Sequence, residues 1–159
     1  MADSNFERMI KMAQEVFDAQ NDANQIQVDE DVIHHLIKLH PAAVTELDYS
    51  EGPVVWILLI PTTEDIMQDF LQHKINEQDI LNKTTPGGNY NAVYLCSAMV
   101  LPEHQQSGLA TSLTLQAIKE IQQTNSIKCL FYWPFTEAGE KLAEKIAQLS
   151  GLVLYKRSN

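Results

Sequence analysis

A short loop in the middle of the chain has the residue types of an anion-binding site. Pro102 fixes a bend after an apolar run and Gly108 precedes a helical pattern, in the stretch Ala98-Met99-Val100-Leu101-Pro102-Glu103-His104-Gln105-Gln106-Ser107-Gly108-Leu109-Ala110-Thr111. The first N–H groups of a helix lack intrahelical partners and the helix dipole makes this end positive, so it binds phosphate groups without basic side chains. The alternative is an ordinary strand-to-helix connection in which Gly108 serves only the tight turn.

The elements that would position this loop alternate along the second half of the chain. Apolar and β-favouring runs predict strands at Ala92–Val100, Ile127–Trp133 and Leu152–Lys156, the first of them buried on both faces. Helical spacing predicts two helices between these strands, one from Gly108 to Gln123 and one between caps at Thr136 and Gly151, with inward residues Leu142, Ile146 and Leu149. This alternation implies at least one parallel crossover, with ligands bound beyond the carboxyl ends of its strands.

The first half predicts helices around a hairpin. An amphipathic helix starts at Ser4 and carries Phe6, Met9, Ile10, Ala13, Val16 and Phe17, and a second follows Asp29 and stops before Pro41. Strands at Ala43–Asp48 and Val54–Ile60 read as an antiparallel hairpin. Thr62 or Thr63 caps a helix through Leu71, and a shorter helix runs through Ile75, Ile80 and Leu81. We expect one α/β (α+β) domain over residues 1–159.

The loop resembles a known family at the level of its motif. Pro102 together with Gln105-Gln106-Ser107-Gly108-Leu109-Ala110 is similar to the [RQ]-x-x-G-x-[GA] signature of the GNAT superfamily of acyl-CoA-dependent N-acetyltransferases. The resemblance runs from about Asn91 to Lys156 and loosely back through the hairpin. It implies a mixed, mostly antiparallel twisted sheet with a central parallel strand pair, flanked by helices. The first third departs from the family, because helices stand where relatives open with a strand and the segment from Thr62 to Leu81 is extra.

The resemblance also implies a co-substrate and its contacts. Acetyl-CoA would bind with its diphosphate on Gln106, Ser107, Gly108, Leu109, Ala110 and Thr111, and with its pantetheine arm along Ala98, Met99 and Val100. The implied activity is direct transfer of an acetyl group to the amine of a small molecule or peptide, with no covalent enzyme intermediate and no metal. Dimers are common among relatives, so a homodimer is possible.

The catalytic residues stay unassigned. In many relatives a Tyr four positions before the helix-ending Gly protonates the departing thiolate, and that position is Ala147 here. Tyr132 and Tyr155 are acid candidates or plain buried and rim tyrosines, and the strand Ala92–Val100 holds no carboxylate base. Glu103 and His104 in the loop contact ligand or are simply solvated. Glu46, Asp48 and Glu51 near the hairpin bind a cationic substrate amine, act as the base, or form a solvated face.

Because no catalytic residue is assigned, two other functions stay open. One is a GNAT-like module that binds acyl-CoA with weak or no transfer, and the other is a small α/β domain with no role in CoA binding.

Charge and composition narrow the ligand classes. Eleven Lys and Arg against 21 Asp and Glu give a net charge of −10, which disfavours nucleic acid and anionic membrane surfaces and favours cationic small molecules. The longest apolar run, Val54–Ile60, is too short to span a bilayer and no signal peptide is readable, so we expect a cytoplasmic protein. Cys96 and Cys129 read as buried reduced thiols, and no metal site is expected at His34, His35 and His40.

Overall fold

A computed structural model describes residues 4, 5, 7–9, 11, 12, 15, 30–105, 107–134 and 136–158. Its strands form one five-stranded sheet in the order β1-β2-β3-β4-β5, with bounds Val44–Tyr49, Gly52–Thr62, Ala92–Val100, Cys129–Tyr132 and Val153–Lys156. Strands β1, β2 and β3 pair antiparallel, whereas β3, β4 and β5 pair parallel. The expected α+β class and mixed sheet are confirmed, and the parallel part has three strands, one more than the expected central pair.

Capping residues mark where several helices begin and end. Their bounds are α2 Glu30–Leu39, α3 Glu64–Leu71, α4 Glu77–Lys83, α5 Leu109–Gln122 and α6 Glu137–Ser150, with 3-10 turns η1 at Pro41–Ala43 and η2 at Pro102–His104. The hydroxyls of Thr63 and Thr136 accept N–H bonds at the starts of α3 and α6, and Gly151 ends α6 with φ of 74°. The described part of the expected first helix, at 5, 7–9, 11, 12 and 15, is helical, and its remaining residues lie outside the described ranges.

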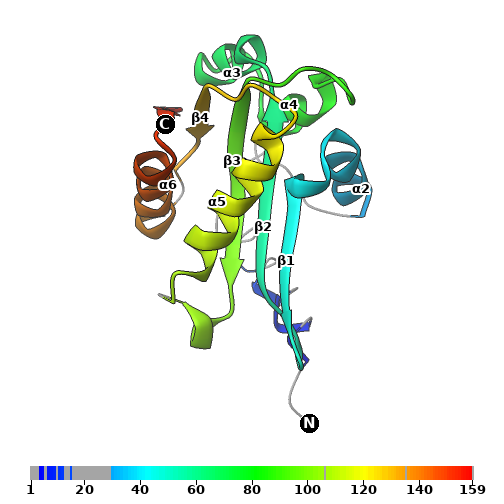
Figure 1. Cartoon of the computed structure of the whole chain (residues 1–159), viewed down its shortest axis with the longest axis vertical. Coiled ribbons are helices and arrows are strands. Elements are labelled where there is room, and N and C mark those ends of the chain that lie inside the picture. Colours follow the sequence, from blue (N-terminus) through cyan, green and yellow to red (C-terminus); the bar gives the residue numbers. More distant parts are fainter. Residues whose placement is uncertain are drawn as a thin grey trace.

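The helices lie on two faces of the sheet. Helix α5 lies across β2 and β3 and packs against α6, and α6 lies beside β4 and β5 (Figure 1). Helix α3 packs on the opposite face, because Phe70 of α3 contacts Tyr94 and Phe131. Tyr132 follows Phe131 directly on β4 and therefore points to the other face, where the charge of Glu140 of α6 acts on it. Tyr94 and Phe131 are register partners and share the α3 face. The sheet therefore separates an α3 face from an α5/α6 face.

The core of the α3 face is aromatic. Phe70, Tyr94 and Phe131 are each at most 1% exposed, and Trp133 joins them with its ring centroid 6.2 Å from that of Phe70. We call these four residues the aromatic cluster. Its rings meet edge-on or tilted, which is the arrangement that ring quadrupoles favour.

Two burial predictions are wrong. Strand β3 is buried at Ala92–Tyr94 but partly exposed from Leu95 onward, because β4 pairs with its first three residues only. Leu149 was predicted to face inward yet is 57% exposed, and the buried residues of α6 are Ala143 and Ile146. The point at which β4 stops is not encoded in the local pattern of β3.

Within the described residues, no helix is both long enough and apolar enough to cross a membrane.

Candidate functional site

The predicted anion-binding loop joins β3 to α5. Leu101 is fully buried and anchors its start, Pro102 opens η2, and the loop ends at Gly108, whose φ of 82° lies in the left-handed region that glycine adopts readily. Gly108 has no side chain to cap α5, so the N–H groups of the first turn keep no side-chain acceptor from the N-cap residue. This end of α5 is therefore equipped to donate to an anion.

A cavity of about 400 Å³ lies at this helix end. Six of the nine residues predicted to contact acetyl-CoA line it: Val100, Ser107, Gly108, Leu109, Ala110 and Thr111. Ala98 and Met99 do not line the cavity, and Gln106 lies outside the described residues. Helix α6 supplies the opposite wall through Ala138, Leu142 and Lys145, and His104 completes the lining. The predicted anion-binding loop therefore faces α6 across a space large enough for a small ligand.

Lys145 is the cationic residue that sequence reasoning missed. It is exposed on α6 and faces the cavity together with Leu142, one helical turn before it. Its position three residues after an inward-facing Leu is visible in the sequence, but its neighbour across the cavity is not. The cavity thus combines a helix N-terminus with one flexible ammonium group, both of which favour a phosphate.

Next to the cavity, the edge of β3 has no strand beside it in the part of the chain that the structure describes. Strand β4 pairs with Ala92, Val93 and Tyr94, and no described strand continues this pairing past Tyr94. The peptide N–H of Leu101 donates to Val54 O at 3.0 Å, so the backbone groups of Val100 and Ala98 point away from β2, toward the open edge. Of the three residues expected along the pantetheine arm, Ala98 and Val100 therefore offer backbone groups there, whereas those of Met99 face β2.

A bulge in β3 accompanies the open edge. Leu58 pairs with Ser97 and Leu59 with Leu95, which leaves Cys96 as an extra residue in β3. A bulge of this kind bends its strand and increases the local twist. On the other side, β4 ends at Tyr132 and is followed at 134 by a proline, which cannot donate to a neighbouring strand. The bulge and the proline both lie just beyond the last paired residues of β3 and β4.

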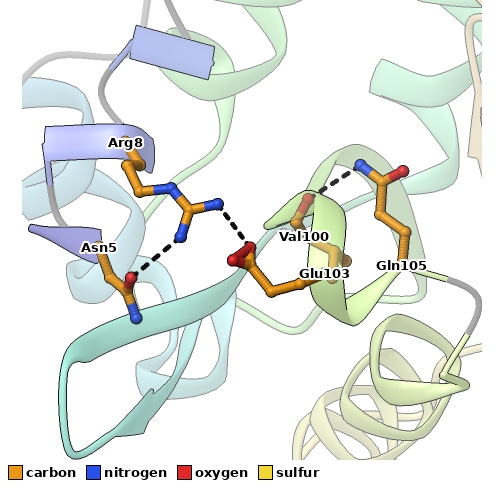
Figure 2. Close-up of polar contacts among 5 residues, drawn as sticks. All are labelled: Asn5, Arg8, Val100, Glu103 and Gln105. Atoms are coloured by element: carbon orange, nitrogen blue, oxygen red, sulfur yellow. Dashed lines mark hydrogen bonds and ion pairs between the residues drawn. The ribbon is translucent and has the colours of Figure 1, made fainter. Parts of the chain in front are cut away.

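Side chains hold the loop from both ends. The Arg8 guanidinium donates to Glu103 Oε1 at 2.6 Å and to Asn5 Oδ1 at 3.3 Å, and Gln105 Nε2 donates to Val100 O at 3.1 Å (Figure 2). The hydrogen bond from Arg8 lowers the pKa of Glu103. Gln105 therefore binds the carbonyl oxygen of Val100, which points toward the open edge. The N–H of Val100 points toward the same edge and takes no part in this bond.

The remaining candidates lie in different places. His104 lines the cavity and meets the Tyr49 ring edge-on at 5.2 Å, whereas Glu103 is bound to Arg8. Tyr132 is buried at the end of β4 on the α6 face, and its burial, followed by the negative charge of Glu140, raises its pKa. Tyr155 is 40% exposed on β5, the outer strand of the sheet. Among the tyrosine candidates, Tyr132 is the better placed because it lies where β3 and β4 diverge.

Neither the hairpin carboxylates nor Ala147 lies on the cavity. Glu46 accepts a hydrogen bond from Trp56 Nε1 at 2.5 Å on the α3 face, the face opposite the cavity. Asp48 and Glu51 are exposed near the hairpin turn. Ala147 is half-buried within α6, and its carbonyl accepts from the N–H of Gly151 at 3.0 Å. An alanine side chain offers no proton at this position.

A buried ionisable group on the α3 face also escaped the sequence analysis. Glu77, in the first turn of α4, is 3% exposed and accepts a hydrogen bond from the Tyr94 hydroxyl. Its only sequence signal is the capping box formed by Asn76 and Asp79, which fixes the helix start but not the burial of the residue between them. Among the described residues, no three His, Cys, Asp or Glu side chains gather as metal ligands.

Comparison with known proteins adds no assignment to this geometry. No family model matches the chain, and neither the curated proteins nor the solved structures contain a match to it.

Proposed function

We propose that this protein is an acyl-CoA-dependent N-acyltransferase of the GNAT type that acetylates a small amine. The observation that carries the proposal is the junction of two features: the cavity at the N-terminus of α5 and the open edge of β3 beside it. A ligand with a diphosphate followed by an amide-bearing arm would satisfy both. The N–H groups of α5 and the ammonium of Lys145 suit the phosphates, and the backbone of Ala98 and Val100 suits amides.

The net charge of −10 is compatible with this anionic co-substrate. Backbone donors at a helix end carry no net charge of their own and act at short range. Charge-assisted hydrogen bonds contribute about 1.5–3 kcal/mol each, so several of them support micromolar binding despite a general repulsion that salt screens.

The proposed reaction transfers the acetyl group in one displacement. A neutral amine nitrogen attacks the thioester carbonyl carbon and forms the C–N bond, the C–S bond breaks, the nitrogen loses a proton, and the CoA thiolate takes up a proton. Tyr132 is the proton donor we favour, because its raised pKa keeps it protonated and it lies where β3 and β4 diverge.

The second candidate is an acyl-CoA-binding module without efficient transfer. The side chain of Ala147 supports it, because the position from which many relatives supply an acid holds only a methyl group here.

Calorimetry and an acceptor screen test the proposal. Acetyl-CoA is titrated into the wild-type protein and into Gly108→Glu, which directs a carboxylate toward the anion-binding loop. We expect micromolar binding to the wild type and none to the variant, and no heat with the wild type overturns any CoA role. CoA release is then followed over amines, polyamines, amino acids and peptides. Tight binding with no working acceptor favours the binding module.

A further inference from the structure

The residue that follows β5 is a buried arginine. Arg157 is 3% exposed, and its guanidinium carbon lies 4.4 Å from the ring centroids of both Phe70 and Trp133. The planes of the two rings lie at 76° to each other, so the guanidinium sits in the corner that they form, where both ring quadrupoles stabilise the cation. Arginine is rarely this buried without a polar partner.

The aromatic rings leave part of this cation unsatisfied. Arg157 Nε and Nη1 are buried and find no hydrogen-bond acceptor among the described residues. Because the two rings are nearly perpendicular, the guanidinium can stack flat on only one of them, and a ring face is a weaker acceptor for an N–H group than an oxygen atom is. Burial of such donors without acceptors is unfavourable, so each one in a native structure requires an explanation. A ligand oxygen supplies one.

The carboxylate of Glu77 lies against the aromatic cluster, at the hydroxyl of Tyr94. The Tyr94 ring packs 5.1 Å from that of Phe70, and its hydroxyl donates to Glu77. Burial and the charge of Glu77 raise the pKa of Tyr94 well above its ordinary value, while the positive charge of Arg157 acts in the opposite direction. A carboxylate on the Tyr94 hydroxyl and a guanidinium on the neighbouring Phe70 ring thus place opposite charges in one buried region, which suits a zwitterion.

This cluster adjoins the open edge of β3 from the face opposite the cavity. The backbone N–H of Arg157 donates to Tyr132 O at 2.9 Å, which ties it to the end of β4, where pairing with β3 has stopped. Phe70, Tyr94 and the Arg157 guanidinium lie on the α3 face, whereas the cavity lies between α5 and α6. A co-substrate along the edge of β3 would thus meet a second substrate arriving from the α3 face.

We propose that Arg157 binds the carboxylate of the acyl acceptor, so that the acceptor is an amino acid: one small molecule that carries both an amine and a carboxylate. The inference rests on the proposed acyltransferase function and names its substrate class. Glu77 with Tyr94 supplies the negative potential for the amine end, and the aromatic cluster excludes water around both charges. Hydrogen bonds to a carboxylate from a desolvated guanidinium are among the strong ones.

The test compares acceptors that differ by a carboxylate alone. CoA release is measured with alanine against ethylamine, phenylalanine against 2-phenylethylamine and lysine against cadaverine, and acetyl-CoA binding is measured separately by calorimetry. We expect at least one amino acid to exceed its matched amine by about 100-fold in kcat/KM. Because this comparison uses the wild-type protein, it does not depend on any variant folding.

The variant Arg157→Lys then tests whether Arg157 causes the preference for amino acids over amines. Lysine keeps the charge and the apolar stem but not the planar donors, so we expect the preference for the amino acid to fall about 10-fold or more with acetyl-CoA affinity unchanged. Lys83→Gln, an exposed charge change at the end of α4, serves as the control and keeps the preference. Equal use of amino acids and amines, no turnover of any acceptor, or a full preference in Arg157→Lys overturns the inference while acetyl-CoA binding stands. No binding of acetyl-CoA overturns the proposed function and this inference with it.

Discussion

Arg8 holds Glu103 across 95 residues of sequence, with Nη2 2.6 Å from Oε1. The first helical segment is thereby fastened to η2, the turn that opens the anion-binding loop (Figure 2). Both side chains are partly exposed, so we expect the pair to contribute little to global stability and to act mainly by fixing η2 relative to the first helical segment.

Removing this ion pair should loosen the loop more than the fold. For Arg8→Ala we expect acetyl-CoA to bind a few-fold more weakly with a small change in melting temperature, measured by calorimetry and by circular dichroism. The exchanged pair Arg8→Glu with Glu103→Arg should restore binding. Since the pKa of Glu103 is lowered in the folded protein, the contribution of the pair is present above the ordinary carboxyl pKa and disappears as the pH falls through the lowered value. An equal effect of Arg8→Ala at neutral and strongly acidic pH would contradict this account.

Two glycines with the same backbone conformation separate stability from binding. Gly108 and Gly151 have φ of 82° and 74°, and a Cβ on either meets no atom within 4 Å. Alanine at each position should therefore destabilise the protein by about 1 kcal/mol through backbone strain alone, measured by urea unfolding. Only Gly108 lines the cavity, so only Gly108→Ala should weaken acetyl-CoA, by about 10-fold. Equal loss of binding in both variants would place the ligand elsewhere.

Lys145 should contribute to binding through its charge. Lys145→Glu reverses the cation that faces the anion-binding loop, and we expect acetyl-CoA affinity to fall by about 10-fold, with a smaller loss at high salt because charge interactions are screened. Lys141→Glu is the matched control: it lies on the same helix and pairs with Glu137 at 3.2 Å. It does not line the cavity, and its affinity should change much less. If the two variants bind equally, net charge accounts for the effect.

Alkaline pH should destabilise the fold through the buried hydroxyl of Tyr94 and the thiol of Cys96, a half-buried residue that the sequence led us to expect fully buried. Burial is the main cause that raises the pKa values of both the Tyr94 hydroxyl and the Cys96 thiol well above their ordinary values. The unfolded chain therefore loses these protons first, at about pH 8.5–10, and above that range the free energy of unfolding falls as pH rises. Tyr94→Phe should make the fall less steep in urea titrations between pH 7 and 11. A slope that is unchanged in Tyr94→Phe would show that Tyr94 ionises as readily in the folded state.

The local parts of this structure were predictable from the sequence. The cap at Thr136, the helix end at Gly151 and the bounds of β3 each depend on residues close in sequence, and each is confirmed. Gly108 at the start of α5 belongs to the same group. The six cavity residues of the loop are neighbours in sequence or nearly so, which is why a motif could point to them.

The rest depends on contacts between distant segments. Glu77 and Tyr94 lie 17 residues apart, and Arg157, near the C-terminus, contacts Phe70 in the middle of the chain. No periodicity marks a glutamate in the first turn of a short helix, or an arginine after the last strand, as buried. The half-exposure of β3 likewise follows from where β4 stops.

The seam between β3 and β4 is only three residue pairs long. Mechanically, the sheet consists of an antiparallel sector and a parallel sector joined by a narrow hinge, with α5 as the main further connection between them. A molecule that forms hydrogen bonds with the edge of β3 and also contacts α6 would connect the two sectors. Binding of such a molecule should then raise both the midpoint and the cooperativity of thermal unfolding. The steepness of the melting curve would therefore report whether the ligand is bound.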